Sequence, residues 1–272
     1  MWTTIVLLGA LAMVDSDPSD VRAGAAARLE RALAETRKAA PEEALTRLER
    51  AATAELEPLA GSRAGTRLAS LLEGERDPAA LRRELARLAA DLAFEPLLEA
   101  PLPVGFPLPT AVDEIELKRY PVYRMARTEM GWTRSNGAFW TLFRHITSRD
   151  IAMTAPVEMT YDNEGRGLRE QRMAFLYANT ELGSAGTQGD VEVVDVPAMQ
   201  VVSLGWRGRP SRADVTAAHA ELLRWIAERG DLEVAGELRL LSYNGPSVSN
   251  ARACSEVQIP VRERKPSATA LD

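Results

Sequence analysis

The stretch that most constrains this chain is residues 138–160, AFWTLFRHITSRDIAMTAPVEMT, because its hydrophobic period changes in the middle. The first half places four apolar residues at the i, i+3, i+4, i+7 spacing of one buried helix face. From Ile151 the pattern alternates with a period of two, which is typical of a strand. The sequence therefore predicts a short helix over 138–147 that leads into a strand. The apolar residues of the helix are Phe139, Leu142, Phe143 and Ile146.

Pro156 lies inside the predicted strand and limits where that strand can sit in a sheet. Proline has no backbone N–H, so it cannot donate a hydrogen bond to a neighbouring strand. We therefore expect this strand to lie at a sheet edge or to bulge at Pro156.

The rest of residues 110–264 supplies partners for this helix and strand. A helical pattern over 213–228 ends at Gly230 and predicts a second helix. The order strand, helix, strand, strand occurs twice, which favours an α+β fold. We expect the two units to join around a pseudo-twofold axis into a curved sheet or a distorted antiparallel β-barrel with two helices, preceded by an N-terminal helical segment. Strands are expected over 115–130, 151–160, 171–178, 191–196, 199–206, 232–243 and 254–261, with a loop over 183–189.

Residues 19–100 have a different composition. Ala, Leu, Arg and Glu dominate, and prolines interrupt the pattern, so the segment predicts three or four short helices. Asp77 followed by Pro78 predicts the N-cap and first residue of one of them. The alternation of Arg and Glu is typical of a solvated helix face, and the alternative is a surface for a partner or for self-association.

Five prolines between residues 96 and 111 exclude a helix or a central strand there. We expect 101–109 to be an extended linker or wrapping arm. The predicted domain boundary therefore falls in this stretch, with 110–264 as the C-terminal domain and 265–272 as a tail.

Residues 1–14, MWTTIVLLGALAMV, are apolar and end abruptly at an acidic segment. The run is too short to span a bilayer, so no integral membrane span is expected. It has the apolar core of a signal or anchor but no preceding Lys or Arg. The localisation therefore stays open between the cytoplasm and export or tethering through residues 1–14.

Composition excludes several classes of function. The 272 residues are 46% hydrophobic and 26% charged, as in ordinary soluble globular proteins. The net charge of −6 gives no basic field to attract nucleic acid. Cys254 is the single cysteine, and His145 and His219 are the two histidines, so an intrachain disulfide and a Cys-rich or multi-His metal centre are excluded.

Several motifs together resemble one known family. They are IELKRYPVYRMA near residue 115, AFWTLFRHI followed by IAMTAPVEM, SYNGP near 243, and SEVQIPV at 255–261. The segment Met153-Thr154-Ala155-Pro156-Val157 is the most distinctive. Over about residues 110–264 the chain resembles the SOUL haem-binding protein family, and the N-terminal helices lie outside this resemblance.

The resemblance implies a pseudo-twofold α+β barrel that binds haem or another tetrapyrrole non-covalently, for transfer, buffering or sensing. It also implies that the ligand lies in an apolar groove beside the first helix. Carried over by position, Phe139, Leu142 and Phe143 would cover the macrocycle. Arg144 would lie near a propionate, to which a guanidinium makes charge-assisted hydrogen bonds.

Two positions depart from the family pattern. Some members are described with a histidine ligand just before the tyrosine of the first strand, and that position is Arg119 here. His145 stands where the family more often has tyrosine, on the flank of the helix rather than in its apolar stripe. We expect His145 to be structural, with an axial iron ligand as the alternative.

Two other functions remain open. An enzyme such as a small-molecule hydrolase on the same fold would need an acid–base pair from Glu158, Glu256, Tyr177 and Tyr243. The chain has no nucleophile elbow and no Ser-His-Asp order, which makes this less favoured. The third interpretation is a structural protein whose helices assemble while its C-terminal domain binds a partner protein.

Overall fold

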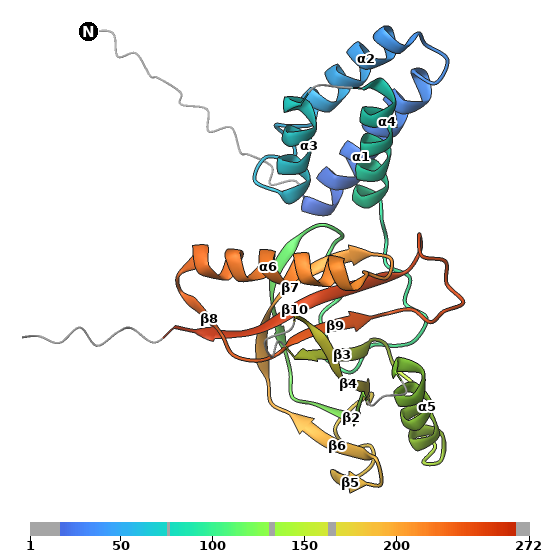
Figure 1. Cartoon of the computed structure of the whole chain (residues 1–272), viewed down its shortest axis with the longest axis vertical. Helices are drawn as coiled ribbons and strands as arrows, with labels where there is room; N and C mark the ends of the chain where they lie inside the picture. The colour runs from blue at the N-terminus through green and yellow to red at the C-terminus, as the bar shows by residue number, and fades with distance from the viewer. Residues whose placement is uncertain (1–16, 75–76, 131–133, 163–166, 265–272) are drawn as a thin grey trace, which may run out of the picture. The chain divides into compact units, whose positions relative to one another are not determined.

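The computed structural model describes residues 17–74, 77–130, 134–162 and 167–264 (Figure 1). The chain divides into two compact units, Met1–Ala93 and Phe94–Asp272. Each unit has its own hydrophobic core.

The described part of the first unit contains four helices, which agrees with the three or four expected from the prolines. Asp77 accepts hydrogen bonds from the backbone N–H groups of Ala79 and Ala80, and Pro78 follows it, so the predicted N-cap is confirmed. Small residues and leucines at helical spacing form the core. None of the described helices is long and apolar enough to cross a membrane. The helices are α1 (Pro18–Glu35), α2 (Pro41–Ala54), α3 (Arg63–Glu73) and α4 (Pro78–Leu92).

Among the residues that the structure describes, the second unit is an α+β fold of two helices and ten strands in one antiparallel sheet. Both predicted helices are present, α5 (Arg134–Thr147) and α6 (Arg212–Arg229). The strands are β1 (Ile115–Tyr120), β2 (Tyr123–Glu129), β3 (Val157–Asp162), β4 (Arg169–Leu176), β5 (Gly186–Gln188), β6 (Val191–Val196), β7 (Met199–Arg207), β8 (Leu232–Val234), β9 (Leu238–Ser242) and β10 (Cys254–Glu263).

The sheet is open, so of the two expected forms, a curved sheet or a distorted barrel, the barrel is wrong. The strand order is β1-β7-β10-β9-β3-β4-β2-β6-β5, with β8 added beside β10. Within the described residues, β1 pairs only with β7 and β5 only with β6. Strand β5 is three residues long, in a stretch expected to be a loop, and offers little backbone to an opposite edge. Closure needs the end strands to pair with each other, and in the described part of the chain β1 and β5 do not.

The strand around Pro156 also differs from the prediction. Strand β3 begins at Val157, after the proline, and pairs with β4 on one side and β9 on the other. Strand β3 is therefore an interior strand. Pro156 does not prevent this, because it comes before the residues of β3 that pair with the two neighbouring strands. The ladder irregularity lies further along, between Thr160 and Tyr161.

Two long predicted strands are each divided in the structure. The predicted strand over 115–130 becomes β1 and β2, which separate at Pro121. The predicted strand over 232–243 becomes β8 and β9, with Gly236 between them. Proline interrupts a strand because it has no backbone N–H to donate, and glycine weakens a strand because it has no side chain to pack.

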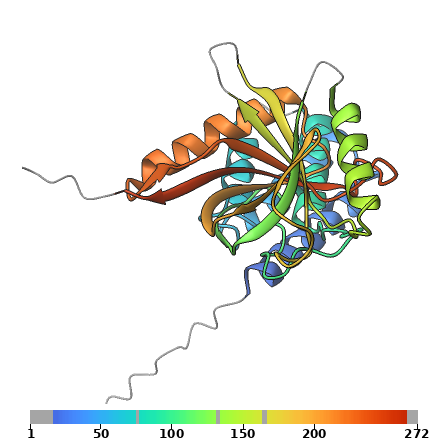
Figure 2. The ribbon, with the colours of Figure 1, turned by 90° about the horizontal axis from the view of Figure 1, so that it is seen from below.

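Helices α5 and α6 cover the same face of the sheet. Val157 and Met159 of β3 pack in the α5 core, and Tyr161, on the same side of the strand, packs in the α6 core. Figure 2 shows the two helices over different parts of the sheet. We call this side the helix face. The opposite side carries the alternate residues of β3, Glu158 and Thr160.

The opposite side is covered in part by the proline-rich segment 94–111, so we call it the arm face. Phe106 packs edge-to-face on Tyr120 and Tyr123, with ring centroids 4.9 and 5.0 Å apart. The backbone N–H of Ala155 donates to Pro101 O, which ties the segment to the chain before β3. The segment thus runs along the sheet as an arm of the second unit.

Candidate functional site

Helix α5 positions all five site residues predicted from the sequence. It packs on β2, β4 and β6 through a core that includes Leu142 and Ile146, which are 0% and 3% exposed. This part of the predicted apolar stripe is buried as expected. The centre of the buried side, however, also includes His145, so the helix is rotated relative to the predicted stripe.

The rotation leaves an aromatic surface on α5. Phe143 is 36% exposed, although the periodicity assigned it to the buried stripe, and Trp140 is 54% exposed. Phe139 lies between them and the core, because its ring also contacts Phe175 of β4 at 5.1 Å. The rings of Phe139 and Phe143 are nearly parallel at 6.0 Å, and Trp140 meets both edge-on at 5.6 Å. We call Phe139, Trp140 and Phe143 the aromatic surface.

His145 is buried, although the helical pattern placed it on the flank. Its Nε2 lies 3.0 Å from the hydroxyl oxygen of Tyr177, the residue that follows β4. This hydrogen bond gives the imidazole nitrogen a partner inside the helix-face core, which offsets the free-energy cost of burying a polar ring. Burial, and next the nearby charge of Arg149, lower the pKa of His145. The imidazole is therefore held neutral and fixed against β4.

Arg144 is exposed beside the aromatic surface, in the last turn of α5. A guanidinium there is free to turn toward an anionic group lying on that surface. Arg119 is exposed on β1, at the position where some family members carry histidine.

The residues present fit a tetrapyrrole in part. Exposed aromatic rings suit an apolar macrocycle, and a nearby guanidinium suits its carboxylates. His145 fits an iron ligand poorly, because its Nε2 is engaged with Tyr177 inside the core. Burial, and next Glu256, raise the pKa of the Cys254 thiol to about 12. In the described part of the chain, no group of three or more His, Cys, Asp or Glu side chains could hold a metal ion.

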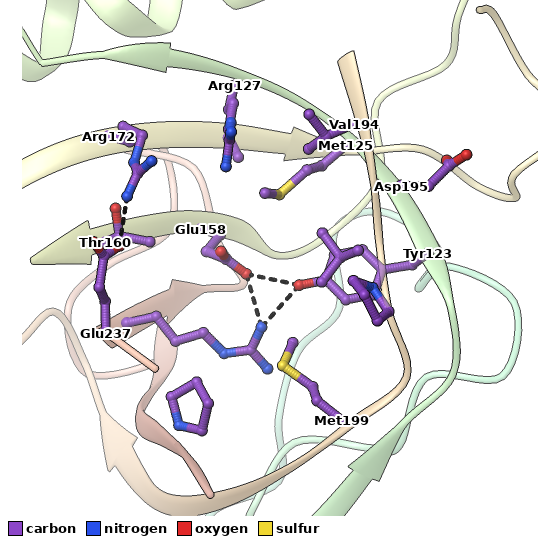
Figure 3. A pocket seen from close by; sticks show the side chains of 15 residues that line it. Tyr123, Met125, Arg127, Glu158, Thr160, Arg172, Val194, Asp195, Met199 and Glu237 are labelled. Atoms are coloured by element: carbon purple, nitrogen blue, oxygen red, sulfur yellow. Dashed lines mark hydrogen bonds and ion pairs between the residues drawn. The ribbon is translucent and has the colours of Figure 1, made fainter. Parts of the chain in front are cut away.

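The arm face contains a second feature, a cavity of about 420 Å³ (Figure 3). Its lining residues come from β2, β3, β4, β6, β7, β9 and β10, among others, and its wall combines apolar and charged side chains. Sequence analysis did not find it, although polar residues alternate with apolar ones in the buried strands around it. The lining includes Tyr123, Met125, Glu158, Thr160, Val194 and Arg239.

A buried hydrogen-bond network extends from this cavity across the arm face. Arg239 Nη1 lies 3.0 Å from Glu158 Oε2 and 2.9 Å from the Tyr123 hydroxyl. Glu256, at 0% exposure, forms an ion pair with Lys118 and accepts a hydrogen bond from the Tyr243 hydroxyl. Desolvation by burial would raise the pKa of Glu256, but Lys118 and the donors around it reverse this, so the pKa is lowered.

The acid–base candidates of the enzyme alternative all have partners inside the protein. Glu158 pairs with Arg239, Glu256 with Lys118, and Tyr177 with His145. Burial and the charge of Glu256 raise the pKa of the Tyr243 hydroxyl well above its ordinary value. All four side chains are buried, and two of them, Tyr243 and Glu256, are hydrogen-bonded to each other.

Comparison with known families gives the class of the protein. The model of the SOUL heme-binding protein family matches residues 106–260, which is more than half of the chain. The chain belongs to the SOUL heme-binding protein family. At the level of the family this implies binding of haem or another tetrapyrrole. The match covers α5, the sheet and the last part of the arm.

Three solved structures that are similar to the chain share little sequence with it. The C-terminal domain of EcmrR is 16% identical, covers 56% of this chain and 98% of its own, and has a TM-score of 0.43. EcmrR in a DNA complex is 14% identical, with 82% and 85% coverage and a TM-score of 0.45. A conserved protein from Listeria innocua is 14% identical, with 54% and 92% coverage and a TM-score of 0.42. No curated protein matches the chain.

Proposed function

We propose that this protein binds haem or a related tetrapyrrole non-covalently on the aromatic surface of α5, for transfer, buffering or sensing. The observation that carries the proposal is the exposure of Trp140 and Phe143 beside Phe139 on one helix. Exposed aromatic rings in contact with one another are typical of a surface that a flat apolar ligand covers. Family membership supplies the identity of the ligand class.

Each residue of α5 has a separate role in this proposal. The aromatic surface contacts the macrocycle, and Arg144 pairs with a propionate at its edge. His145 holds α5 against β4 through Tyr177 and so positions the surface without contacting iron. Bound haem would supply a redox-active iron, and the chain's contribution is to shield one side of the macrocycle from water.

A haemin titration followed in the Soret region tests the aromatic contact. We expect the full-length chain to saturate at one equivalent and Phe143→Ala to weaken binding about tenfold, since a lost ring contact and its buried area are of that order. Leu223→Ala is the matched control, because Leu223 is 38% exposed on α6 and Phe143 is 36% exposed on α5. Equal affinities of the two variants would reject the aromatic surface.

The role of Arg144 is tested by charge and by salt. Arg144→Gln should weaken haemin binding several-fold at low ionic strength, and the difference from the unchanged chain should shrink as salt is added, because salt screens an exposed ion pair. Arg119→Gln is the control, because Arg119 is an exposed arginine on β1, outside α5. An Arg144→Gln effect that is independent of salt would contradict propionate pairing.

We also propose that the sheet arose from two related halves. The strand order β7-β10-β9-β3-β4-β2 supports this. If β2 is taken as equivalent to β7, β3 to β9 and β4 to β10, the order is the same when read from either end. A helix follows the first strand of each half. In this arrangement α5 and α6 are equivalent, but only α5 carries the aromatic surface.

A further inference from the structure

The cavity on the arm face lies on the opposite side of the sheet from the aromatic surface. Along β2, Met125 lines the cavity, whereas the next residue, Ala126, packs in the α5 core. Successive side chains of a strand point to opposite faces. A ligand in this cavity would therefore not contact α5.

Two residues that line the cavity each have a buried polar atom with unused hydrogen-bonding capacity. Among the residues that the structure describes, Arg239 Nη2 and Thr160 Oγ1 contact no hydrogen-bond partner. The two residues are directly paired in the register of β3 and β9. Buried polar groups are almost always hydrogen-bonded, so two orphans on adjacent strands of one cavity point to a ligand acceptor.

The Arg239 guanidinium is held in place by its other nitrogens. Nε donates to Gln258 Oε1 at 2.9 Å, and Nη1 donates to the Tyr123 hydroxyl and to Glu158 Oε2. Burial acts to lower the pKa of Arg239, but the Glu158 carboxylate together with Tyr123 and Tyr120 more than offsets this, so the pKa is raised. The remaining Nη2 is thus a fixed, charged donor.

A second arginine lies on the other side of Thr160. Arg172 of β4 is the register partner of Thr160, and its guanidinium forms an ion pair with Glu237 at 2.6 Å. Figure 3 shows Arg172 and Thr160 close together at one end of the cavity. The Arg172 side chain is 22% exposed and that of Glu237 is 46% exposed, so a ligand could compete for this arginine. The row Arg172, Thr160, Arg239 presents donors along three adjacent strands.

The remainder of the wall is apolar. Met125, Val194 and Met199 face the same space (Figure 3). The volume of about 420 Å³ lies within the range of small-molecule sites. A ligand that satisfies both parts of the wall has an acceptor group at one end and an apolar body.

We propose that this cavity is a second ligand site, specific for a small apolar carboxylate whose oxygens accept hydrogen bonds from Arg239 Nη2 and Thr160 Oγ1. A cationic ligand is disfavoured, because the buried acid of the wall, Glu158, already accepts from Arg239 and Tyr123. The acid at the opening, Glu237, is paired with Arg172.

Isothermal titration of the full-length chain with three probes of one shape tests the charge preference. The probes are 2-naphthoate, its neutral amide 2-naphthamide and the cation 2-naphthylmethylamine. We expect saturable binding of 2-naphthoate, at least about tenfold tighter than the amide, since a charge-assisted pair is worth at least one such factor. Binding of the amine as tightly as the carboxylate, or no saturable binding of the carboxylate, overturns the proposal.

Two variants place the ligand in the cavity. Thr160→Val removes a hydroxyl that has no partner in the described protein, so the fold is retained while 2-naphthoate affinity falls several-fold. Val194→Trp fills the cavity and should abolish 2-naphthoate binding. Thr216→Val is the control, because Thr216 donates to Arg212 O within α6. Unchanged affinity in both cavity variants would place the ligand elsewhere.

Haemin binding separates this proposal from the function proposed above. Trp140→Ala should retain 2-naphthoate affinity while losing haemin affinity, and Val194→Trp should do the reverse. Loss of 2-naphthoate binding in Trp140→Ala would show that the two ligands share one site. It would contradict the proposal of a second site, whatever the result for haemin.

Discussion

Glu256 stays ionised inside the sheet because donors surround both of its oxygens. The backbone N–H of Thr110 and the hydroxyl of Ser203 donate to Oε1, at 2.7 and 2.9 Å, beside the Lys118 ammonium. Tyr243 donates to Oε2. A charge this deeply buried is stable only while its counter-charge is present. The stability of the arm face therefore depends on Lys118.

Lys118→Met should destabilise the protein strongly at neutral pH. It leaves the Glu256 carboxylate buried without its counter-charge, and breaking such a pair costs about 3–5 kcal/mol. In the unchanged protein the fold lowers the pKa of Glu256. Its ionisation therefore stabilises the fold at pH values above its pKa in the unfolded chain, about 4.3. This stabilisation is lost as the pH falls through the pKa of Glu256 in the folded protein. Urea unfolding measures the difference in free energy.

The pH dependence of the unfolding free energy of Lys118→Met tests whether the buried charge causes the loss of stability. Without Lys118, burial raises the pKa of Glu256, so the variant should regain stability as pH falls toward about 4.5, where the carboxyl becomes neutral. Lys118→Met combined with Glu256→Gln should recover part of the loss at neutral pH. A penalty that is the same at both pH values would show that charge is not its cause.

His145 should make stability depend on pH in a higher range than Glu256 does. Its pKa is lowered in the fold, chiefly by burial, so the unfolded chain binds a proton first. The stability that depends on neutral His145 is present above the unfolded pKa of about 6.5 and is lost as pH falls below it. His145→Gln should flatten the change in unfolding free energy between about pH 7.5 and 5.5. His219→Gln is the comparison, because burial also lowers the pKa of His219.

At the scale of elements, the arm is attached to the sheet where a glycine permits close approach. A Cβ built on Gly205 of β7 would lie 2.2 Å from Ala111 O and 2.4 Å from Thr110 O. The backbone N–H of Asp113 donates to Gly205 O at 2.9 Å, and Val112 forms an isolated bridge with Gly205. The arm and β7 are thus in direct backbone contact, and Thr110 reaches Glu256 from there.

Gly205→Ala should displace the arm and cost about 1–3 kcal/mol of unfolding free energy, the usual cost of forcing a methyl group into a packed site. Gly245→Ala is the control, since the nearest atom to its added Cβ would be a Glu99 side-chain oxygen at 3.6 Å. Both are measured by urea unfolding. Equal stability of the two variants would mean that the arm moves without cost.

The elements differ in how far periodicity could predict them. Helix α6 was found with nearly its full extent, because its buried residues follow one regular face and Gly230 ends it in a left-handed conformation. The extent of α5 was also close, but its rotation was not, because a hydrogen bond to Tyr177 makes a polar residue buried while Phe143 is exposed. Hydrophobic periodicity cannot predict a hydrogen bond to a residue that is distant in sequence.

At the scale of the whole molecule, the motifs near α5 and β10 were sufficient to identify the family and the fold class. They were not sufficient for sheet closure, which depends on whether the edge strands β1 and β5 meet. The cavity was also missed, because it requires knowing that Thr160 of β3 lies beside Arg239 of β9. Strand register over such separations is a property of the assembled sheet.

The two compact units should behave independently in unfolding. The leucine core of the helical unit lies within residues 21–92, and the cores of the second unit lie within 94–261. We expect residues 94–272, expressed alone, to unfold at the same temperature as the corresponding transition of the full chain and to bind haemin equally. A large drop in that temperature would show that the helical unit stabilises the sheet.

The location of the tetrapyrrole is the central claim, and one titration tests it most directly. Haemin is titrated into the full-length chain, into the double variant Trp140→Ala with Phe143→Ala, and into Val194→Trp. The account predicts that the double variant loses haemin affinity by about a hundredfold, as two aromatic contacts are removed. It predicts that Val194→Trp binds haemin unchanged. Loss of haemin binding in Val194→Trp, with the double variant unaffected, would place the tetrapyrrole in the arm-face cavity and contradict the account.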